Sequence, residues 1–175
     1  PTIPEADRCE FRGCNAYDNW DDGIHSQFSI RMSYSDNRCY GNGEAGIDML
    51  GDDSNAVVGN VCYNNGLNGI EAGNTTASGT PDAHHTITGN TCADHTGSGI
   101  QLSGAGNGSI NHVVSGNVCE GNTQRGIYLV NAPVTDCLVV GNIARNNSNR
   151  GIYIANAGGG APAGNVITAN YAEGN

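Results

Sequence analysis

A twelve-residue pattern sets the architecture of this chain: Gly59-Asn60-Val61-Cys62-Tyr63-Asn64-Asn65-Gly66-Leu67-Asn68-Gly69-Ile70. The same pattern returns, with substitutions, at 89–100, 116–127 and 141–152, and its closing Gly-Ile pair also stands at 23–24 and 46–47. The mean spacing of these pairs is about 26 residues. Regular self-similarity at such a period indicates a stacked repeat protein in which every copy is one structural unit.

Three columns of residues keep their offsets in the copies. Seven residues before each glycine stands a small side chain, and the column reads Ala16, Cys39, Cys62, Cys92, Cys119 and Ala144, with Ala172 beginning a seventh copy. Two residues earlier the column reads Cys14, Asn37, Asn60, Asn90, Asn117, Asn142 and Asn170. Three residues earlier again it reads Phe11, Tyr34, Val57, Ile87, Val114, Val139 and Ile167. Length varies only in the loop after each Gly-Ile strand, within 52–54, 75–84, 105–111 and 157–163.

Short strands, not helices, fit this repeat. The chain contains 27 glycines and 24 asparagines, which disfavour helix interiors and favour turns. Apolar and polar residues alternate within segments such as 126–130, which predicts strands with the isoleucine inward and the next residue outward. We therefore expect an all-β, right-handed parallel β-helix of about seven coils, formed by residues 1–175 as a single domain with repeats from residue 9. The leucine spacing of a leucine-rich repeat is absent.

Composition narrows the range of partners. Seven arginines and no lysine face seventeen carboxylates, for a formal net charge of −10. Such a surface repels phosphate backbones and anionic lipid, so we expect neither nucleic acid nor a membrane as partner. No stretch approaches the length of a membrane span. The hydrophobic fraction of 37% is nevertheless sufficient for a thin core.

The seven cysteines are interpreted as thiols rather than as a disulfide framework. Cys39, Cys62, Cys92 and Cys119 would stack inward on successive coils, in a geometry that does not suit disulfides, and Cys-x-x-Cys spacing is absent. Free thiols indicate folding in a reducing compartment, as for a virion protein released by lysis.

The pattern Gly-Asn-x-Cys-x-x-Asn followed by Gly-Ile resembles the right-handed parallel β-helix repeat of the pectate-lyase-like superfamily. The resemblance implies action on a polysaccharide, acidic or neutral, by a protein that is extracellular or associated with a virion. The segment from Asn19 to Ile24, which reads Asn-Trp-Asp-Asp-Gly-Ile, is similar to stretches in tailspike-like and secreted bacterial β-helix proteins. The Asp-Pro-His triplet of the epimerases is absent.

The candidate site is the outward column that follows each Gly-Ile pair. It reads His25, Asp48, Glu71, Gln101, Tyr128 and Tyr153. Strand spacing of ~4.8 Å places the two carboxylates on adjacent coils, where one should have a raised pKa. Paired carboxylates are what glycoside hydrolysis requires. We expect catalysis by His25, Asp48, Glu71 and Asp22, with Asp21 enlarging the acidic cluster.

Two alternatives remain open at this stage. A lyase or epimerase would need a base such as His25 together with a group that neutralises a uronate carboxylate. The later coils supply expected substrate-binding residues, which are Gln101, Arg125, Tyr128, Arg150 and Tyr153. The column also fits solvated carboxylates and an edge-protecting tyrosine pair, which would make the molecule a non-catalytic shaft or glycan-binding surface.

No cofactor is required by the sequence. Calcium is the ion that Asp48, Asp52 and Asp53 would suit, although turn preference explains the last two equally well. A weaker metal set consists of Asp82, His84, His85 and His112. Asn74, Asn107 and Asn146 stand in glycosylation sequons. The repeat shows no capping helix, so we expect a fragment of a longer chain, or ends covered by flanking domains or by the mates of a homotrimer.

Overall fold

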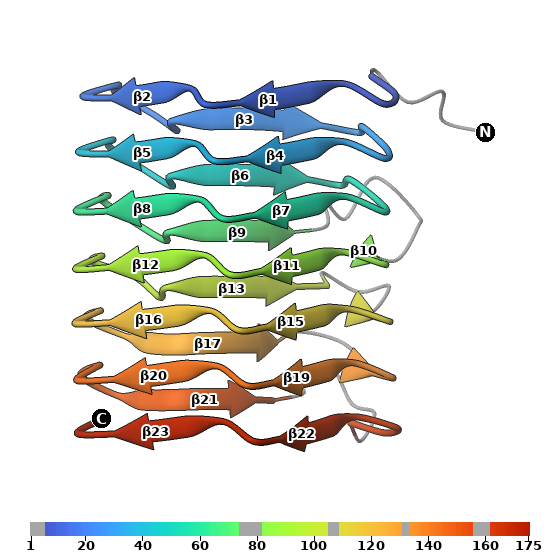
Figure 1. Cartoon of the computed structure of the whole chain (residues 1–175), viewed down its shortest axis with the longest axis vertical. Helices are drawn as coiled ribbons and strands as arrows, with labels where there is room; N and C mark the ends of the chain where they lie inside the picture. Colours follow the sequence, from blue (N-terminus) through green and yellow to red (C-terminus); the bar gives the residue numbers. More distant parts are fainter. Residues whose placement is uncertain (1–5, 74–81, 105–108, 131–133, 156–161) are drawn as a thin grey trace.

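The computed structural model describes residues 6–73, 82–104, 109–130, 134–155 and 162–175. These residues form a stack of coils in which every strand pairs in parallel with the equivalent strand of the next coil (Figure 1). Because each coil repeats the same path, the strands build three long parallel sheets, as the sequence predicts. The described part of the chain has no helix of the length and apolarity needed to cross a membrane.

The three principal sheets run the length of the molecule. The first contains β1 (Glu10–Arg12), β4 (Ser33–Ser35), β7 (Ala56–Val58), β11 (Thr86–Thr88), β15 (Val113–Ser115), β19 (Leu138–Val140) and β22 (Val166–Thr168). The second contains β2 (Asn15–Tyr17), β5 (Arg38–Tyr40), β8 (Val61–Tyr63), β12 (Thr91–Ala93), β16 (Val118–Glu120), β20 (Ile143–Arg145) and β23 (Tyr171–Glu173). The third, which we call the site sheet, contains β3 (Ile24–Gln27), β6 (Ile47–Leu50), β9 (Ile70–Gly73), β13 (Ile100–Ser103), β17 (Arg125–Val130) and β21 (Arg150–Ile154).

A short fourth sheet lies next to the variable loops. It consists of β10 (Asp82–Ala83), β14 (Ser109–Ile110) and β18 (Val134–Thr135). Most of the predicted variable loops lie outside the described residues, as do the sequon positions Asn74 and Asn107 and the side chain of Asp82.

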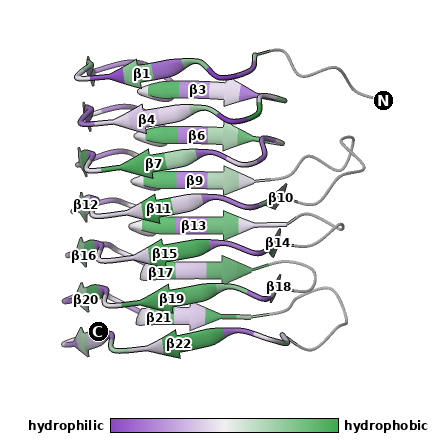
Figure 2. Cartoon of the chain, turned by 45° about the vertical axis from the view of Figure 1, so that its right-hand side comes forward, coloured by the Kyte–Doolittle hydropathy of each residue, from purple (hydrophilic) through white to green (hydrophobic). Residues whose placement is uncertain are grey.

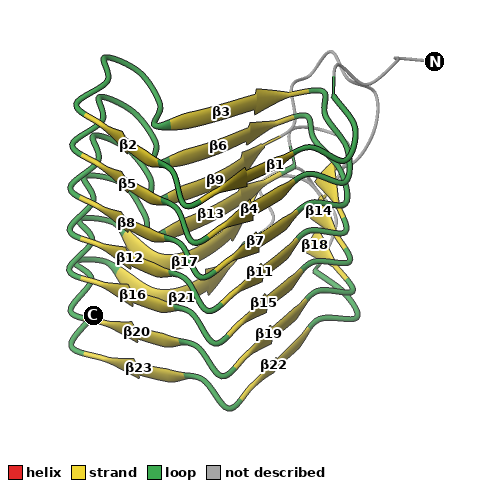
Figure 3. Cartoon of the chain, turned by 45° about the horizontal axis from the view of Figure 1, so that its top comes forward, coloured by secondary structure: helices red, strands yellow, loops and turns green. Residues whose placement is uncertain are grey.

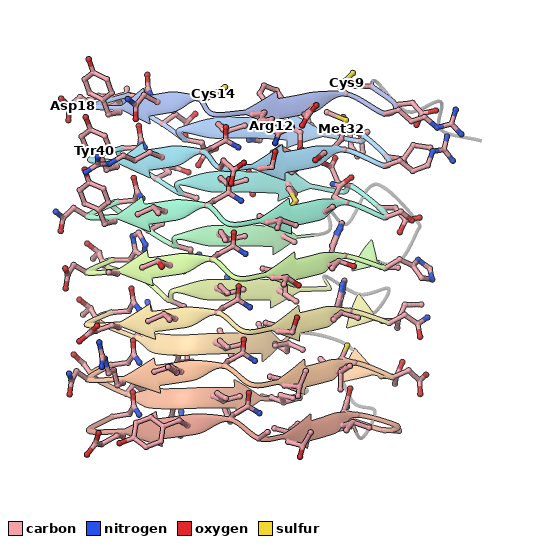
Figure 4. The ribbon with its side chains drawn as sticks, in the orientation of Figure 1. Cys9, Arg12, Cys14, Asp18, Met32 and Tyr40 are labelled. Carbon is pink, nitrogen blue, oxygen red and sulfur yellow. The ribbon has the colours of Figure 1, made fainter. Side chains whose placement is uncertain are left out.

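The core is built from the inward columns. Ile47, Ile70, Ile100 and Ile127 pair in register along the site sheet and are fully buried. The aliphatic and cysteine columns stack in the same way on the other two sheets. Figure 2 shows these apolar positions as hydrophobic bands interrupted by hydrophilic ones along the strands. Cys39, Cys62, Cys92 and Cys119 are buried and free, which confirms the prediction of core thiols. Cys9 and Cys14, labelled in Figure 4, are exposed.

Left-handed residues produce the corners of each coil. At the corner between the first and second sheets, the residue before each ladder asparagine has a positive φ, as in Gly59 (68°), Gly89 (67°) and Gly141 (65°). Figure 3 shows the bend that results at this corner in every coil. Glycine adopts this conformation without steric cost, and aspartate and asparagine tolerate it better than other residues. The unusual composition therefore follows from the number of corners.

The predicted asparagine ladder forms at this corner. The side-chain amide of Asn90 donates to the carbonyl oxygen of Val57 and to Oδ1 of Asn117, both at 2.9 Å. Its own Oδ1 accepts the backbone N–H and the side-chain amide of Asn60, both at 2.9 Å. The ladder thus satisfies buried polar groups of consecutive coils that no water reaches.

Two further corner columns stand five residues on either side of this ladder. The later column comprises Asn19, Asn42, Asn65, His95, Asn122, Asn147 and Asn175, linked by the same side-chain to backbone bonds. The earlier column includes Asn55, His85, His112, Cys137 and Asn165. Of these positions, only the central column and the histidines His85 and His112 were predicted from the sequence. The fixed offset of five residues was the signal for the rest.

Candidate functional site

The outward face of the site sheet carries the predicted column. His25 lies beside Asp48 on the next strand, Asp48 beside Glu71, and Glu71 beside Gln101. Tyr128 and Tyr153 continue the same line on β17 and β21. The buried isoleucines that precede these residues fix the backbone register. The six outward side chains therefore share one strip along the coil axis.

An ion-paired cluster forms on the first two coils. Nδ1 of His25 lies 3.0 Å from Oδ2 of Asp22 and 2.9 Å from Oδ2 of Asp48. Nδ1 of His25 therefore lies between two carboxyl groups, and Nε2 is the ring nitrogen that takes no part in these contacts. The other carboxylate oxygen of Asp22 accepts the backbone N–H of Ala45 at 2.8 Å, so the next coil holds Asp22 in place.

Asp48 has the most perturbed carboxyl group of this strip. Burial is the largest cause that raises its pKa, to about 7, and the charges of Asp22 and Glu71 raise it further, whereas His25 lowers it. A carboxyl group with such a pKa is present in both protonation states near neutral pH. It can therefore donate or accept a proton in a reaction.

Glu71 is positioned by neighbours on its own and the following coil. Oε2 accepts the side-chain amide of Asn68 at 2.6 Å, and Oε1 accepts that of Gln101 at 3.3 Å. Burial raises the pKa of the Glu71 carboxyl, and these two hydrogen bonds oppose the shift. Gln101, which the sequence predicts to bind substrate, also orients Glu71 in this structure. Sequence analysis did not single out Asn68, whose offset from Glu71 is three residues.

Carboxylates also gather where the turn enters the site sheet. Ligand atoms of Asp21, Asp22 and Glu44 all lie within 4.8 Å of one another, as do those of Asp22, His25 and Asp48. The charge of Asp21 is the largest cause that raises the pKa of the Glu44 carboxyl. Either group offers oxygen or nitrogen ligands to a divalent cation.

The calcium set expected from the sequence is not brought together. Asp48, Asp52 and Asp53 do not form a group of oxygens within 4.8 Å. Asp52 is buried, where its carboxylate accepts the Ser26 hydroxyl, the backbone N–H of Ser29 at 2.7 Å and the Asn55 amide at 3.1 Å. The physical reason is that β6 ends at Leu50: strand alternation would keep Asp52 on the outward face of Asp48, but the turn after the strand directs Asp52 into the core instead.

The histidine set is also divided in the part of the chain that the structure describes. His85 and His112 are fully buried, with rings stacked at 5.2 Å, and their Nδ1 atoms accept backbone N–H groups of the preceding coils. His84 is exposed, and its Nδ1 lies 3.1 Å from Asp53. Adjacent residues of a bent backbone thus point to opposite sides, which separates the ligands of the expected metal site.

Arginine and tyrosine side chains stack on the later coils. The guanidinium carbon of Arg125 lies 3.9 Å from the ring centroid of Tyr128, and that of Arg150 lies 4.2 Å from the ring centroid of Tyr153. The two rings are 5.5 Å apart and nearly parallel. These contacts cover ring faces that a sugar would otherwise reach, and they hold the guanidinium groups near the surface strip.

A family model for the right-handed β-helix region matches residues 3–79 and 72–175. The chain therefore belongs to the right-handed β-helix family. No curated protein sequence matches it.

Solved structures show the same fold at low sequence identity. The A-module of the mannuronan C-5 epimerase AlgE4 of Azotobacter vinelandii is 19% identical, with a TM-score of 0.69 over 81% of this chain and 37% of that chain. The periplasmic alginate epimerase AlgG is 17% identical, with a TM-score of 0.68 over 95% and 46%. The Dettilon tailspike protein is 18% identical, with a TM-score of 0.64 over 87% and 34%. The chain thus spans less than half the length of these three proteins.

Proposed function

We propose that this chain is a polysaccharide-active β-helix module that cleaves a glycosidic bond by general acid–base catalysis at Asp48 and Glu71. The observation that carries the proposal is the Asp48 carboxyl group, whose pKa of about 7 lets it act as an acid at neutral pH beside a second carboxyl group on the next strand. The polymer would follow the strip along the site sheet. Similarity to proteins titled as alginate epimerases and as a tailspike supports this substrate class and a location outside the cytoplasm.

Each residue has a defined task in this reaction. Protonated Asp48 donates its proton to the glycosidic oxygen as the bond to the anomeric carbon breaks. The Glu71 carboxylate attacks the anomeric carbon as the leaving sugar departs, because adjacent strands lie ~4.8 Å apart and carboxyl groups ~5 Å apart belong to the retaining mechanism. Water then attacks the anomeric carbon of the glycosyl ester, which releases Glu71 as a carboxylate, and Asp48 takes up the proton of that water and regains its acid form. His25 and Asp22 hold Asp48 through the contacts of Nδ1.

Hydrolysis fits this geometry better than β-elimination or epimerisation. Those reactions need positive charge at the uronate carboxylate. Within the described site sheet, arginines are present only on β17 and β21, whereas Asp48 and Glu71 are on β6 and β9. The contacts of the His25 ring nitrogen Nδ1 are with the carboxyl groups of Asp22 and Asp48, neither of which neutralises a uronate carboxylate.

A polysaccharide panel with three readouts tests the proposal. Neutral and uronate polymers are assayed for new reducing ends, for the absorbance of unsaturated uronates and, by proton NMR, for inverted sugar units. We expect reducing ends from at least one polymer and their loss in Asp48→Asn and Glu71→Gln. Asp36→Asn is the matched control, since this exposed carboxylate lies at the corner between β4 and β5 and asparagine tolerates its φ of 56°.

The other outcomes overturn the proposal. Unsaturated uronates or inverted units without hydrolysis would assign lyase or epimerase chemistry, with His25 as the base. Binding of a polymer without any turnover, unchanged in both variants, would assign a non-catalytic glycan-binding surface or shaft.

A further inference from the structure

Trp20 is the most exposed large hydrophobic side chain among the described residues. It is the only tryptophan of the chain, and its side chain is 97% exposed. An isolated protein gains nothing in stability from an indole in this position, since burial is what stabilises large apolar groups. An exposed aromatic ring offers an apolar face on which a ligand can stack.

Trp20 stands at the turn between β2 and β3 and borders a hollow of about 560 Å³. The hollow is lined by Asp18, Asn19, Trp20, Gly41, Gly43 and Glu44. Asp18 and Tyr40, labelled in Figure 4, mark this end of the coils. Two consecutive turns thus contribute one aromatic ring, one amide and two carboxylates to the same concave surface.

Glycines allow the two turns beside the hollow to pack closely against each other. A Cβ on Gly43 would lie 1.9 Å from the carbonyl oxygen of Trp20, so no side chain fits between the two turns. Gly41 has a φ of +65°, and a Cβ there would lie 2.7 Å from Oδ1 of Asp18. The spacing of the two turns is therefore set by close backbone packing, and the side chains of Asp18, Trp20 and Glu44 complete the hollow.

The hollow is anchored to the corner ladder and adjoins the candidate site. Asn19 donates its side-chain amide to Oδ1 of Asn42 at 2.8 Å, which fastens the Trp20 turn to the corner ladder. Glu44 lines the hollow and also belongs to the carboxylate group with Asp21 and Asp22. Asp22 in turn lies 3.0 Å from His25. A ligand in the hollow would continue directly into the strip on the site sheet.

We infer that this hollow is a binding subsite for an uncharged, hydroxyl-rich sugar unit. The indole of Trp20 stacks on the apolar face of the pyranose ring, and the carboxylates of Asp18 and Glu44 accept its hydroxyl protons. The described residues that line the hollow include two carboxylates and no arginine, so a uronate would be repelled. The ligand class rests on the proposed function, whereas the subsite requires no catalysis.

The single tryptophan makes a direct test available. Emission and acrylamide quenching of Trp20 are followed while oligomers of glucose, galactose or mannose, and separately oligomers of mannuronate or galacturonate, are titrated into the whole chain carrying Asp48→Asn. We expect a neutral series to shift the emission and protect the indole, with Trp20→Ala weakening calorimetric binding at least ~10-fold and Trp20→Phe by less. Leu67→Ala is the control, because Leu67 is 45% exposed on the same run of turns but does not line the hollow.

Three outcomes would overturn the inference. Polymer binding that is unchanged in Trp20→Ala, with emission unmoved, would reject the subsite and leave the proposed function intact. Protection by uronates but not by neutral sugars would reject the assigned ligand. Equal losses in Trp20→Ala and Leu67→Ala would indicate a general apolar effect of the turn surface. Loss of turnover in Asp48→Asn alone would bear only on the proposed function.

Discussion

The two halves of the site sheet have the same backbone and different chemistry. On β3, β6 and β9 the outward strip carries His25, Asp48 and Glu71, whereas on β17 and β21 it carries Tyr128 and Tyr153 with arginines stacked on them. The inward isoleucines are identical in both halves and pair in register throughout. In-register stacking therefore constrains the inside of the coil and leaves the outside free to specialise. Carboxyl and imidazole groups are concentrated at one end of the strip, and arginine–tyrosine contacts at the other.

The largest expected effect is a loss of stability when the asparagine ladder, which runs through both halves, is interrupted. Asn90→Ala removes four hydrogen bonds at 2.9 Å, among them the bond in which Asn90 Oδ1 accepts the buried backbone N–H of Asn60 and the bond that the Asn90 amide donates to the carbonyl oxygen of Val57. Each buried group left unpaired costs ~1–3 kcal/mol, so the free energy of unfolding should fall by several kcal/mol. Denaturant unfolding measures this loss. The exposed Asn149→Ala is the control, with an expected change within ~0.5 kcal/mol. If Asn90→Ala lowers the free energy of unfolding no more than Asn149→Ala does, the hydrogen bonds of the ladder do not stabilise the fold as proposed.

The second effect separates the halves in catalysis. Asp48→Asn should lower turnover by ~10²–10⁴-fold while substrate binding is retained, because the amide cannot donate a proton as an acid. Arg150→Ala, three coils or more from the acid cluster, should change binding before turnover. Initial rates at several substrate concentrations distinguish the two. Equal loss of turnover in both variants would contradict the proposal that the acidic half performs catalysis and the arginine half binds the polymer.

The inside of the molecule was predictable from the sequence, and the site only in part. Fixed offsets revealed the strand columns, the cysteine stack and the central asparagine ladder, because in-register stacking imposes one residue type on each interior position. The outward order His25, Asp48, Glu71 followed from the same offsets. The sequence could not show that Asp22 lies against His25, or that Asp52 turns inward to Ser26. Those contacts depend on the path of the turns, where the alternation of a strand no longer applies.

The pH dependence of stability is a third test, confined to the acidic half. The folded pKa of Asp48, about 7, lies above its ordinary value of 3.8, so the unfolded chain ionises first as the pH rises. The free energy of unfolding should therefore fall between pH 4 and pH 7, by at most ~4 kcal/mol at ~1.4 kcal/mol per pH unit, and then level off. Asp48→Asn should remove most of this slope in urea unfolding followed by circular dichroism. A slope equal in variant and parent would show that another group titrates.

The smallest expected effect tests the cationic half. Arg125 lies over both Tyr128, at 3.9 Å, and Tyr153, at 5.3 Å, whereas Arg150 lies over Tyr153 alone. If these arginines meet anionic substituents of the polymer, Arg150→Ala should weaken binding of a uronate polymer by a few-fold, ~0.5–1 kcal/mol, and reduce its sensitivity to salt. Binding of a neutral polymer should change less. Arg145→Ala is the matched control, since it removes the same charge from β20 on another face, where Arg145 pairs with Glu120 at 2.8 Å. Affinity electrophoresis at two salt concentrations compares the variants.

If Arg145→Ala weakens binding as much as Arg150→Ala, net charge alone accounts for the effect and the arginines of the site sheet have no special role. If only Arg150→Ala acts, anionic units of the polymer bind at the end of the strip opposite the acids, and the polymer extends along the site sheet as far as β21.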